Sequence, residues 1–149
     1  MTMTPQQYHL TEGPKLRDAL QAAQDAARNR RDTAERHLIL NAAKAAGIRL
    51  PKEATPYKKY SHSDDDCWEI GGVRVRITVL GGVDGPAYRD AENDYQRTHK
   101  RRKTLCKTLN VSGANAFAAF CKTKYGRDLP EATLKRAHSE WLDLLCCDC

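Results

Sequence analysis

The sequence predicts an α+β domain that is mainly helical, with a long N-terminal helix, a central β-hairpin and a C-terminal segment of three helices. Three patterns support this class: apolar residues recur at helical spacing in 14–47, alternate in 67–82, and return to helical spacing in 84–147. The chain has 149 residues, of which 40% are hydrophobic. That is the size of one ordinary domain, so we expect residues 1–149 to form a single domain.

The long helix is predicted over residues 14–47. Thr11-Glu12-Gly13-Pro14 is typical of a helix start, and Gly47 is a plausible stop. Between them lies a narrow apolar stripe with charged flanks: Leu16, Leu20, Ala23, Ala27, Ala34 and Leu38. A narrow stripe suits a helix that packs along one face, either on another helix or on a partner subunit. Residues 48–66, which contain Pro51 and Pro56, show no helical period and are predicted to be a connector.

The hairpin is predicted over residues 67–82, where Val73, Val75 and Ile77 alternate with polar residues. Gly71-Gly72 suits its two-residue turn. An isolated hairpin is marginally stable and has unpaired edges. We therefore expect either pairing with a second copy, which would make a homodimer, or covering by the long helix of the same chain.

The basic helical segment is predicted over residues 84–147. Asp84-Gly85-Pro86 favours a helix start, and an apolar stripe then continues to about Leu109. Ser112 is the predicted cap of a short helix that stops at Gly126, and Pro130 begins the last helix.

The net charge of +6 is concentrated in one part of the chain. Residues 1–94 carry 14 basic and 14 acidic residues, whereas residues 95–136 carry 11 basic and two acidic ones. Such a segment is suited to a phosphate backbone. The predicted nucleic-acid contacts are Arg97, Lys100, Arg101, Arg102, Lys103, Lys107, Lys122, Lys124 and Arg127.

An ordinary structural role competes with this interpretation for the first five of these residues. Asp90, Glu92 and Asp94 precede the basic run on the same predicted helix, and this order complements any helix dipole. The dipole does not require the basic residues beyond that helix, such as Lys122 and Lys124. Their presence favours binding.

Residues 112–145 resemble part of the high-mobility-group box. The shared features are an Asn115-Ala116-Phe117 helix that continues to Phe120, a basic turn with Pro130, and a later helix with Trp141. No third helix follows, and the densest basic run lies upstream of the motif. The resemblance implies that Phe117, Phe120 and Trp141 are core residues and that Ser112 and Asn115 face a DNA minor groove. Aromatic residues at this spacing are also the ordinary pattern of a packed core.

The six cysteines are expected to be reduced thiols. The N-terminus lacks the pattern of a signal peptide and no apolar run is long enough for a membrane span, so we expect a cytoplasmic, reducing location and no membrane partner. Cys146, Cys147 and Cys149 crowd too closely for ordinary zinc knuckles. We favour reactive thiols at a frayed helix end over a metal site completed by Cys121 or His138. His62 with Asp64, Asp65 and Asp66 is a weaker metal candidate, so we expect neither metal nor cofactor.

Together these patterns predict a protein that binds nucleic acid without catalysis. The sequence contains no phosphate loop, nucleophile elbow or nucleotide fingerprint. The alternative is a small inhibitor or adaptor, of the kind mobile genetic elements encode, whose basic residues bind an acidic protein surface of a nucleic-acid-processing complex.

Overall fold

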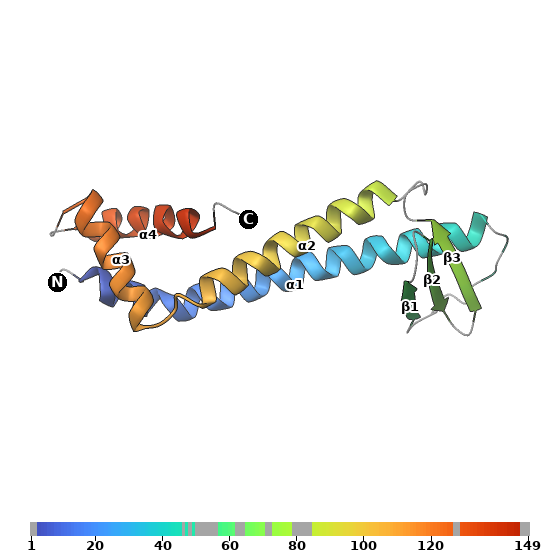
Figure 1. Ribbon diagram of the computed structural model, residues 1–149, viewed down its shortest axis with the longest axis horizontal. Coiled ribbons are helices and arrows are strands. Elements are labelled where there is room, and N and C mark those ends of the chain that lie inside the picture. Colours follow the sequence, from blue (N-terminus) through green and yellow to red (C-terminus); the bar gives the residue numbers. More distant parts are fainter. Residues whose placement is uncertain are drawn as a thin grey trace. The chain divides into compact units, whose positions relative to one another are not determined.

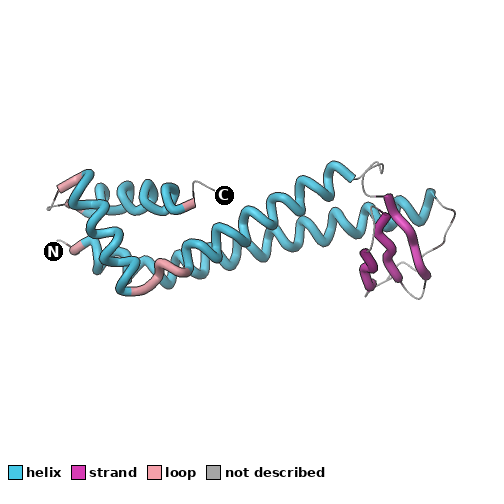
Figure 2. The backbone as a smooth tube through the Cα atoms, in the orientation of Figure 1, coloured by secondary structure: helices cyan, strands magenta, loops and turns pink. Residues whose placement is uncertain are grey.

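The computed structural model describes residues 3–45, 47, 49, 57–61, 65–70, 73–78, 85–126 and 129–146, with the backbone alone for residues 42–43 and for the strands. The elements within these residues are four helices and three strands: α1 (Pro5–Ala45), β1 (Tyr57–Ser61), β2 (Asp65–Ile70), β3 (Val73–Thr78), α2 (Gly85–Cys106), α3 (Val111–Lys124) and α4 (Glu131–Leu145) (Figures 1 and 2). They form two compact units, of which unit 1 comprises residues 1–25 and 96–149 and unit 2 comprises residues 26–95.

Helix α1 begins at Pro5, earlier than the predicted start near Pro14. The backbone N–H of Gln7 donates to Thr4 Oγ1 (3.2 Å), and the N–H of Thr4 donates to Gln7 Oε1 (2.9 Å). This reciprocal pair is a capping box, and Pro5 takes the first helical position, where a missing N–H costs nothing. Pro14 therefore lies inside α1.

The end of α1 agrees with the prediction. The helix stops at Ala45, and Gly47 has a φ of +73°. The N–H of Gly47 donates to the carbonyl of Lys44 (3.1 Å). A residue in this left-handed conformation closes a helix, and glycine adopts it without steric cost.

Unit 1 is built from helices alone in its described residues: the first turns of α1, the end of α2, and α3 and α4. Phe117 and Trp141, which were predicted to be core residues, are 0% and 6% exposed. Phe120 is half-buried, with its ring 6.4 Å from that of Tyr125. The buried core residues are Tyr8, Leu20, Leu105, Phe117, Cys121, Leu129, Leu134, Ala137, Trp141, Leu142 and Cys146.

The turn between α2 and α3 is set by Asn110, not by the predicted cap Ser112, which is exposed. Asn110 Oδ1 accepts from the N–H of Gly113 (2.8 Å) and so satisfies one free donor of the first turn of α3. A Cβ at position 113 would overlap the backbone of Thr108. Glycine is therefore the residue that lets α3 start so close to the preceding turn.

Unit 2 holds the rest of α1, the sheet and the start of α2. The strands form an antiparallel sheet in the order β1-β2-β3, with Tyr57 opposite Ile70 and Ile70 opposite Val73. Helices α1 and α2 are joined by polar contacts: the Arg31 guanidinium lies 4.2 Å from the centre of the Tyr95 ring and 3.6 Å from Glu92.

The predicted α+β class with a central hairpin is wrong. Helix makes up 87% of the residues whose side chains the structure describes, and those residues include no strand, so this part of the protein is all-α. Among the strands, which are described by their backbone alone, β2 and β3 do pair antiparallel, with Ile70 opposite Val73, but they belong to a three-stranded sheet and not to an isolated hairpin. A third strand, β1, lies within the predicted connector and pairs with β2. The sequence Tyr57-Lys58-Lys59-Tyr60 alternates too briefly for its period to reveal a strand.

Candidate nucleic-acid interface

The densest predicted basic run lies in the last turns of α2, within unit 1. Arg97, Lys100, Lys103 and Lys107 are exposed, and Lys107 lies just beyond the end of the helix. Arg97, Lys100 and Lys103 are spaced by three residues within α2, so they share one side of the helix. We call these four residues the α2 basic face. Residues 95–127 contain no Asp or Glu, so no carboxylate of this segment interrupts the face.

Arg101 and Arg102 lie differently and are half-buried. Arg102 is three residues before the fully buried Leu105, on the side of α2 that meets the core. Its Nε is buried without a hydrogen-bond partner among the described residues. Arg101 Nη2 lies 3.5 Å from Asp143 of α4. The structure therefore separates these two arginines from the exposed face that the sequence grouped them with.

The predicted residues of α3 lie in its last turn. Lys122 is exposed, and Lys124 donates to Glu140 of α4 (2.8 Å). The hydroxyl of Tyr125 donates to the same carboxylate. These two bonds hold the pKa of Glu140 below its usual value, and the carboxylate raises the pKa of Lys124. Arg127 lies outside the described residues.

Helix α4 thus carries carboxylates that form ion pairs with two of the basic residues predicted to contact phosphates. Glu140 pairs with Lys124, and Asp143, one turn later, pairs with Arg101. Sequence reasoning did not find these partners, although the acidic residues of the last helix were visible as a local reversal of charge. The pairs reduce the net positive field beside α4.

A buried pair of histidines is the main feature that sequence reasoning missed. His9 is 0% exposed and His138 is 7% exposed. His9 Nδ1 lies 2.9 Å from His138 Nε2, and His9 Nε2 lies 2.6 Å from the carbonyl oxygen of Thr108. The available signal was the spacing of Leu134, His138 and Trp141, which places the histidine on the apolar side of α4.

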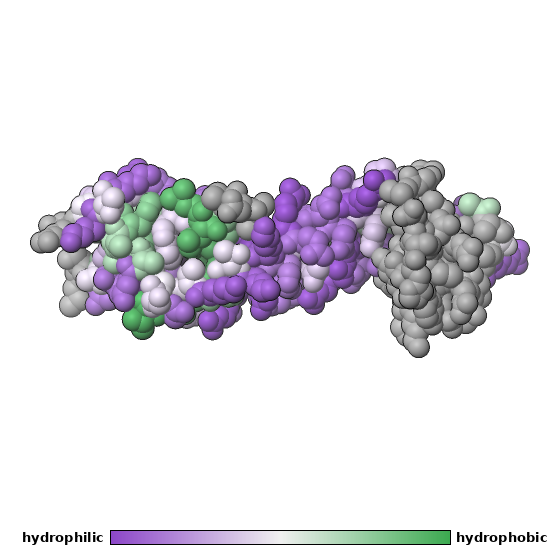
Figure 3. Space-filling view, in the orientation of Figure 1, coloured by the Kyte–Doolittle hydropathy of each residue, from purple (hydrophilic) through white to green (hydrophobic). Residues whose placement is uncertain are grey.

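The surface of unit 1 also exposes apolar side chains. Figure 3 shows apolar residues over the part of unit 1 that holds α3 and α4, and the most exposed of the described large ones are Val111 (66%) and Leu144 (57%). Ser112 and Asn115, which the box-like resemblance places at a minor groove, are exposed at the start of α3. They are not on the α2 helix that carries the basic face.

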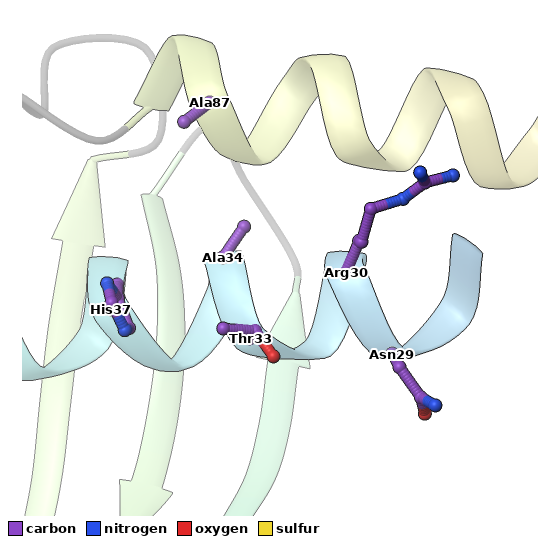
Figure 4. Close-up of a pocket in the computed structure, with 6 residues that line it drawn as sticks. All are labelled: Asn29, Arg30, Thr33, Ala34, His37 and Ala87. Carbon is purple, nitrogen blue, oxygen red and sulfur yellow. The ribbon is translucent and has the colours of Figure 1, made fainter. Parts of the chain in front are cut away.

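A pocket in unit 2 is lined by Asn29, Arg30, Thr33, Ala34 and His37 of α1 and by Ala87 of α2 (Figure 4). Ala34 and Ala87 point toward each other, while Asn29 points away from α2. The guanidinium of Arg30 is bound to Asp94. The one arginine of this lining is therefore neutralised, and the pocket lacks the cationic character expected of a phosphate site.

Two cysteines of unit 1 have structural positions. Cys121 and Cys146 are buried in the core of unit 1, and burial raises the pKa of the Cys121 thiol to about 11. A thiol with so high a pKa is a poor metal ligand and a poor nucleophile. Within the described residues no three His, Cys, Asp or Glu side chains gather in a group that could hold a metal ion. Cys147, Cys149 and the candidate loop from His62 to Asp64 lie outside them.

No family model, no curated protein and no solved structure matches this chain. Of the helices in the described ranges, none combines the length and the apolar character needed to cross a bilayer.

Proposed function

We propose that this protein binds nucleic acid without catalysis, through the α2 basic face of Arg97, Lys100, Lys103 and Lys107. The observation that carries the proposal is the exposure of all four side chains within a segment, residues 95–127, that has no carboxylate. Lysine and arginine side chains at successive turns of a helix reach successive phosphates of a backbone. Binding of this kind gains free energy from the release of condensed counterions.

The test is the salt dependence of binding. Fluorescence anisotropy with duplex and single-stranded probes is measured over a series of salt concentrations for the parent and for the triple variant Lys100→Gln, Lys103→Gln, Lys107→Gln. The slope of log affinity against log salt should become less negative by roughly 0.7–0.9 per lost phosphate contact, so by roughly 2 to 3 in all.

A matched control separates the α2 basic face from net charge. Lys15→Gln, Arg17→Gln and Lys44→Gln remove the same charge from exposed positions of α1, outside the basic segment 95–136. The control should keep the parent slope. Equal slopes in all three proteins, with unchanged circular dichroism, would show that the α2 basic face only solvates the helix.

The second candidate is an inhibitor or adaptor that binds an acidic protein surface. The ion pairs Arg101–Asp143 and Lys124–Glu140 favour it, because they show that basic residues of this segment accept carboxylates as partners. Complementary protein surfaces retain their partner at high salt through buried contacts, whereas sequence-independent phosphate binding decays steeply. If no probe binds at low salt, nucleic-acid binding is excluded and this candidate replaces it.

A further inference from the structure

The hydrogen bonds of His9 and His138 fix where their protons are. A carbonyl oxygen only accepts, so the ring of His9 donates from Nε2 to Thr108. In a neutral ring the other nitrogen, Nδ1, is then an acceptor, and His138 Nε2 must carry the hydrogen that it receives. In the neutral pair both rings are therefore protonated at Nε2. Two hydrogen bonds in series thus link three elements: His138 of α4 donates to His9 of α1, and His9 donates to the Thr108 carbonyl in the turn between α2 and α3.

The surroundings of the pair disfavour an added proton. The His138 ring lies 4.9 Å from the centre of Phe117 and 5.4 Å from that of Tyr8, and Trp141 lies 5.3 Å from His9. Glu12 of α1 is the carboxylate that favours a charge on His138, and Glu131 of α4 acts on Tyr8. The other titratable groups packed in the described part of this core are the thiols of Cys106, Cys121 and Cys146 and the phenol of Tyr125. Aromatic rings and neutral thiols stabilise an imidazolium far less than water does.

One proton added to the pair leaves a charge in these apolar surroundings, and the bond between the rings need not break, because the hydrogen of His138 can lie on either ring nitrogen. A proton on His138 Nδ1 would keep that bond but leave a charge among Phe117 and Trp141. Burial, and next the neighbouring His9, lower the pKa of His138 to about 4. The unfolded histidine takes up its proton near pH 6.5, so the docked state loses stability as pH falls from about 6.5 to about 4.

The helical hydrogen bonding between the segment that this pair holds and the rest of α1 is weakened at Pro14. Pro14 has no N–H, so the carbonyl of Leu10 lacks its helical donor. Residues Pro5–Gly13 are thus joined to the rest of α1 by one backbone hydrogen bond fewer than in an uninterrupted helix. They contact the core through Tyr8 and His9, which are both buried. We propose that residues Pro5–Gly13 form an acid-released latch, which is docked on α3 and α4 while His9 and His138 are neutral and detaches when the pair takes up a proton.

Hydrogen exchange of the amides of Tyr8–Gly13 tests the latch in the full chain. After correction for the intrinsic exchange rate, the opening equilibrium should rise roughly fiftyfold between about pH 7 and about pH 4.5, given a folded pKa of about 4. In His138→Gln the amide either donates to or accepts from His9 and does not titrate, so this acid response should be largely lost. His37→Gln, at an exposed position of α1 in unit 2, removes a histidine outside the pair and should respond like the parent.

Two results would overturn the proposal. One is an equal acid response in His138→Gln and the parent, because the release would then belong to other groups. The other is independent of any variant: nitrogen chemical shifts of the parent at neutral pH that show either ring charged or protonated at Nδ1. This measurement decides the matter if His138→Gln does not fold.

Discussion

Gly113 lies in the first turn of α3, where its missing side chain makes room for the Thr108 backbone. The same Thr108 carbonyl accepts the hydrogen bond from His9, so a displacement of this turn also disturbs the histidine pair. Gly113→Ala should lower the free energy of unfolding by about 1–3 kcal/mol, because the strain of overpacking exceeds the better helix propensity of alanine. Urea denaturation measures this change.

Ser112→Ala is the control for Gly113→Ala, because Ser112 is exposed in the same turn. It does not cap α3, since Asn110 is the N-cap of that helix. Ser112→Ala should change the stability by less than about 0.5 kcal/mol. A Gly113→Ala variant as stable as this control would mean that the turn shifts freely, and the close approach would then be unimportant.

For single residues, the sequence predicted burial correctly where apolar residues recur at a helical spacing. Phe117 and Trp141 recur at helical spacing, and both are buried. His9 and His138 are 129 positions apart, so no local pattern joins them. Ser112 and Asn110 are both good capping residues, and the choice between them depends on where α2 ends.

The carboxylates of α4 form ion pairs with two basic residues of segment 95–136, Arg101 and Lys124. They therefore limit how strongly these two residues attract an anion. If phosphates compete with these carboxylates for Arg101 and Lys124, the double variant Glu140→Gln, Asp143→Asn should bind an anionic probe more tightly, by roughly two- to fivefold at low salt. The effect should fade as salt rises. Anisotropy titrations at low and high salt measure it, and this prediction rests on the proposed function.

Asp18→Asn with Asp25→Asn is the charge-matched control for the α4 variant, because both residues are exposed on α1 of unit 1. An equal gain in this control would assign the effect to net charge, and no gain in either protein would show that Arg101 and Lys124 do not contact the probe.

The elements themselves were predictable to different degrees. Helix α3 ends at Lys124, two residues before the predicted stop Gly126, and α4 begins at Glu131, directly after Pro130. Glycine and proline predict these boundaries well because they act through backbone geometry that few contexts override. The start of α1 was misplaced, since Thr11 to Pro14 and Thr4 to Gln7 are both typical start signals and the sequence does not rank them. Strand β1 was missed because a five-residue strand depends on its partner β2 more than on its own pattern.

The whole molecule is predicted to self-associate through its sheet. In the order β1-β2-β3 the outer strands are β1 and β3, and an outer strand offers an edge for pairing with a second copy. Sedimentation equilibrium at micromolar concentrations should show a dimer, which proline substitutions along β3 should weaken. A monomer mass for the parent at all concentrations would contradict the prediction.

The division of the chain into units has a consequence for biosynthesis. Unit 2 is continuous in sequence, residues 26–95, whereas unit 1 joins the first 25 residues to residues 96–149. In sequence, unit 2 is therefore an insertion between the two segments of unit 1. All of its residues have been synthesised before residues 96–149 are translated. The N-terminal turns of α1, with Tyr8 and His9, must wait until α4 has been translated before their core exists. Unit 1 therefore closes last, through contacts of high sequence separation that form slowly.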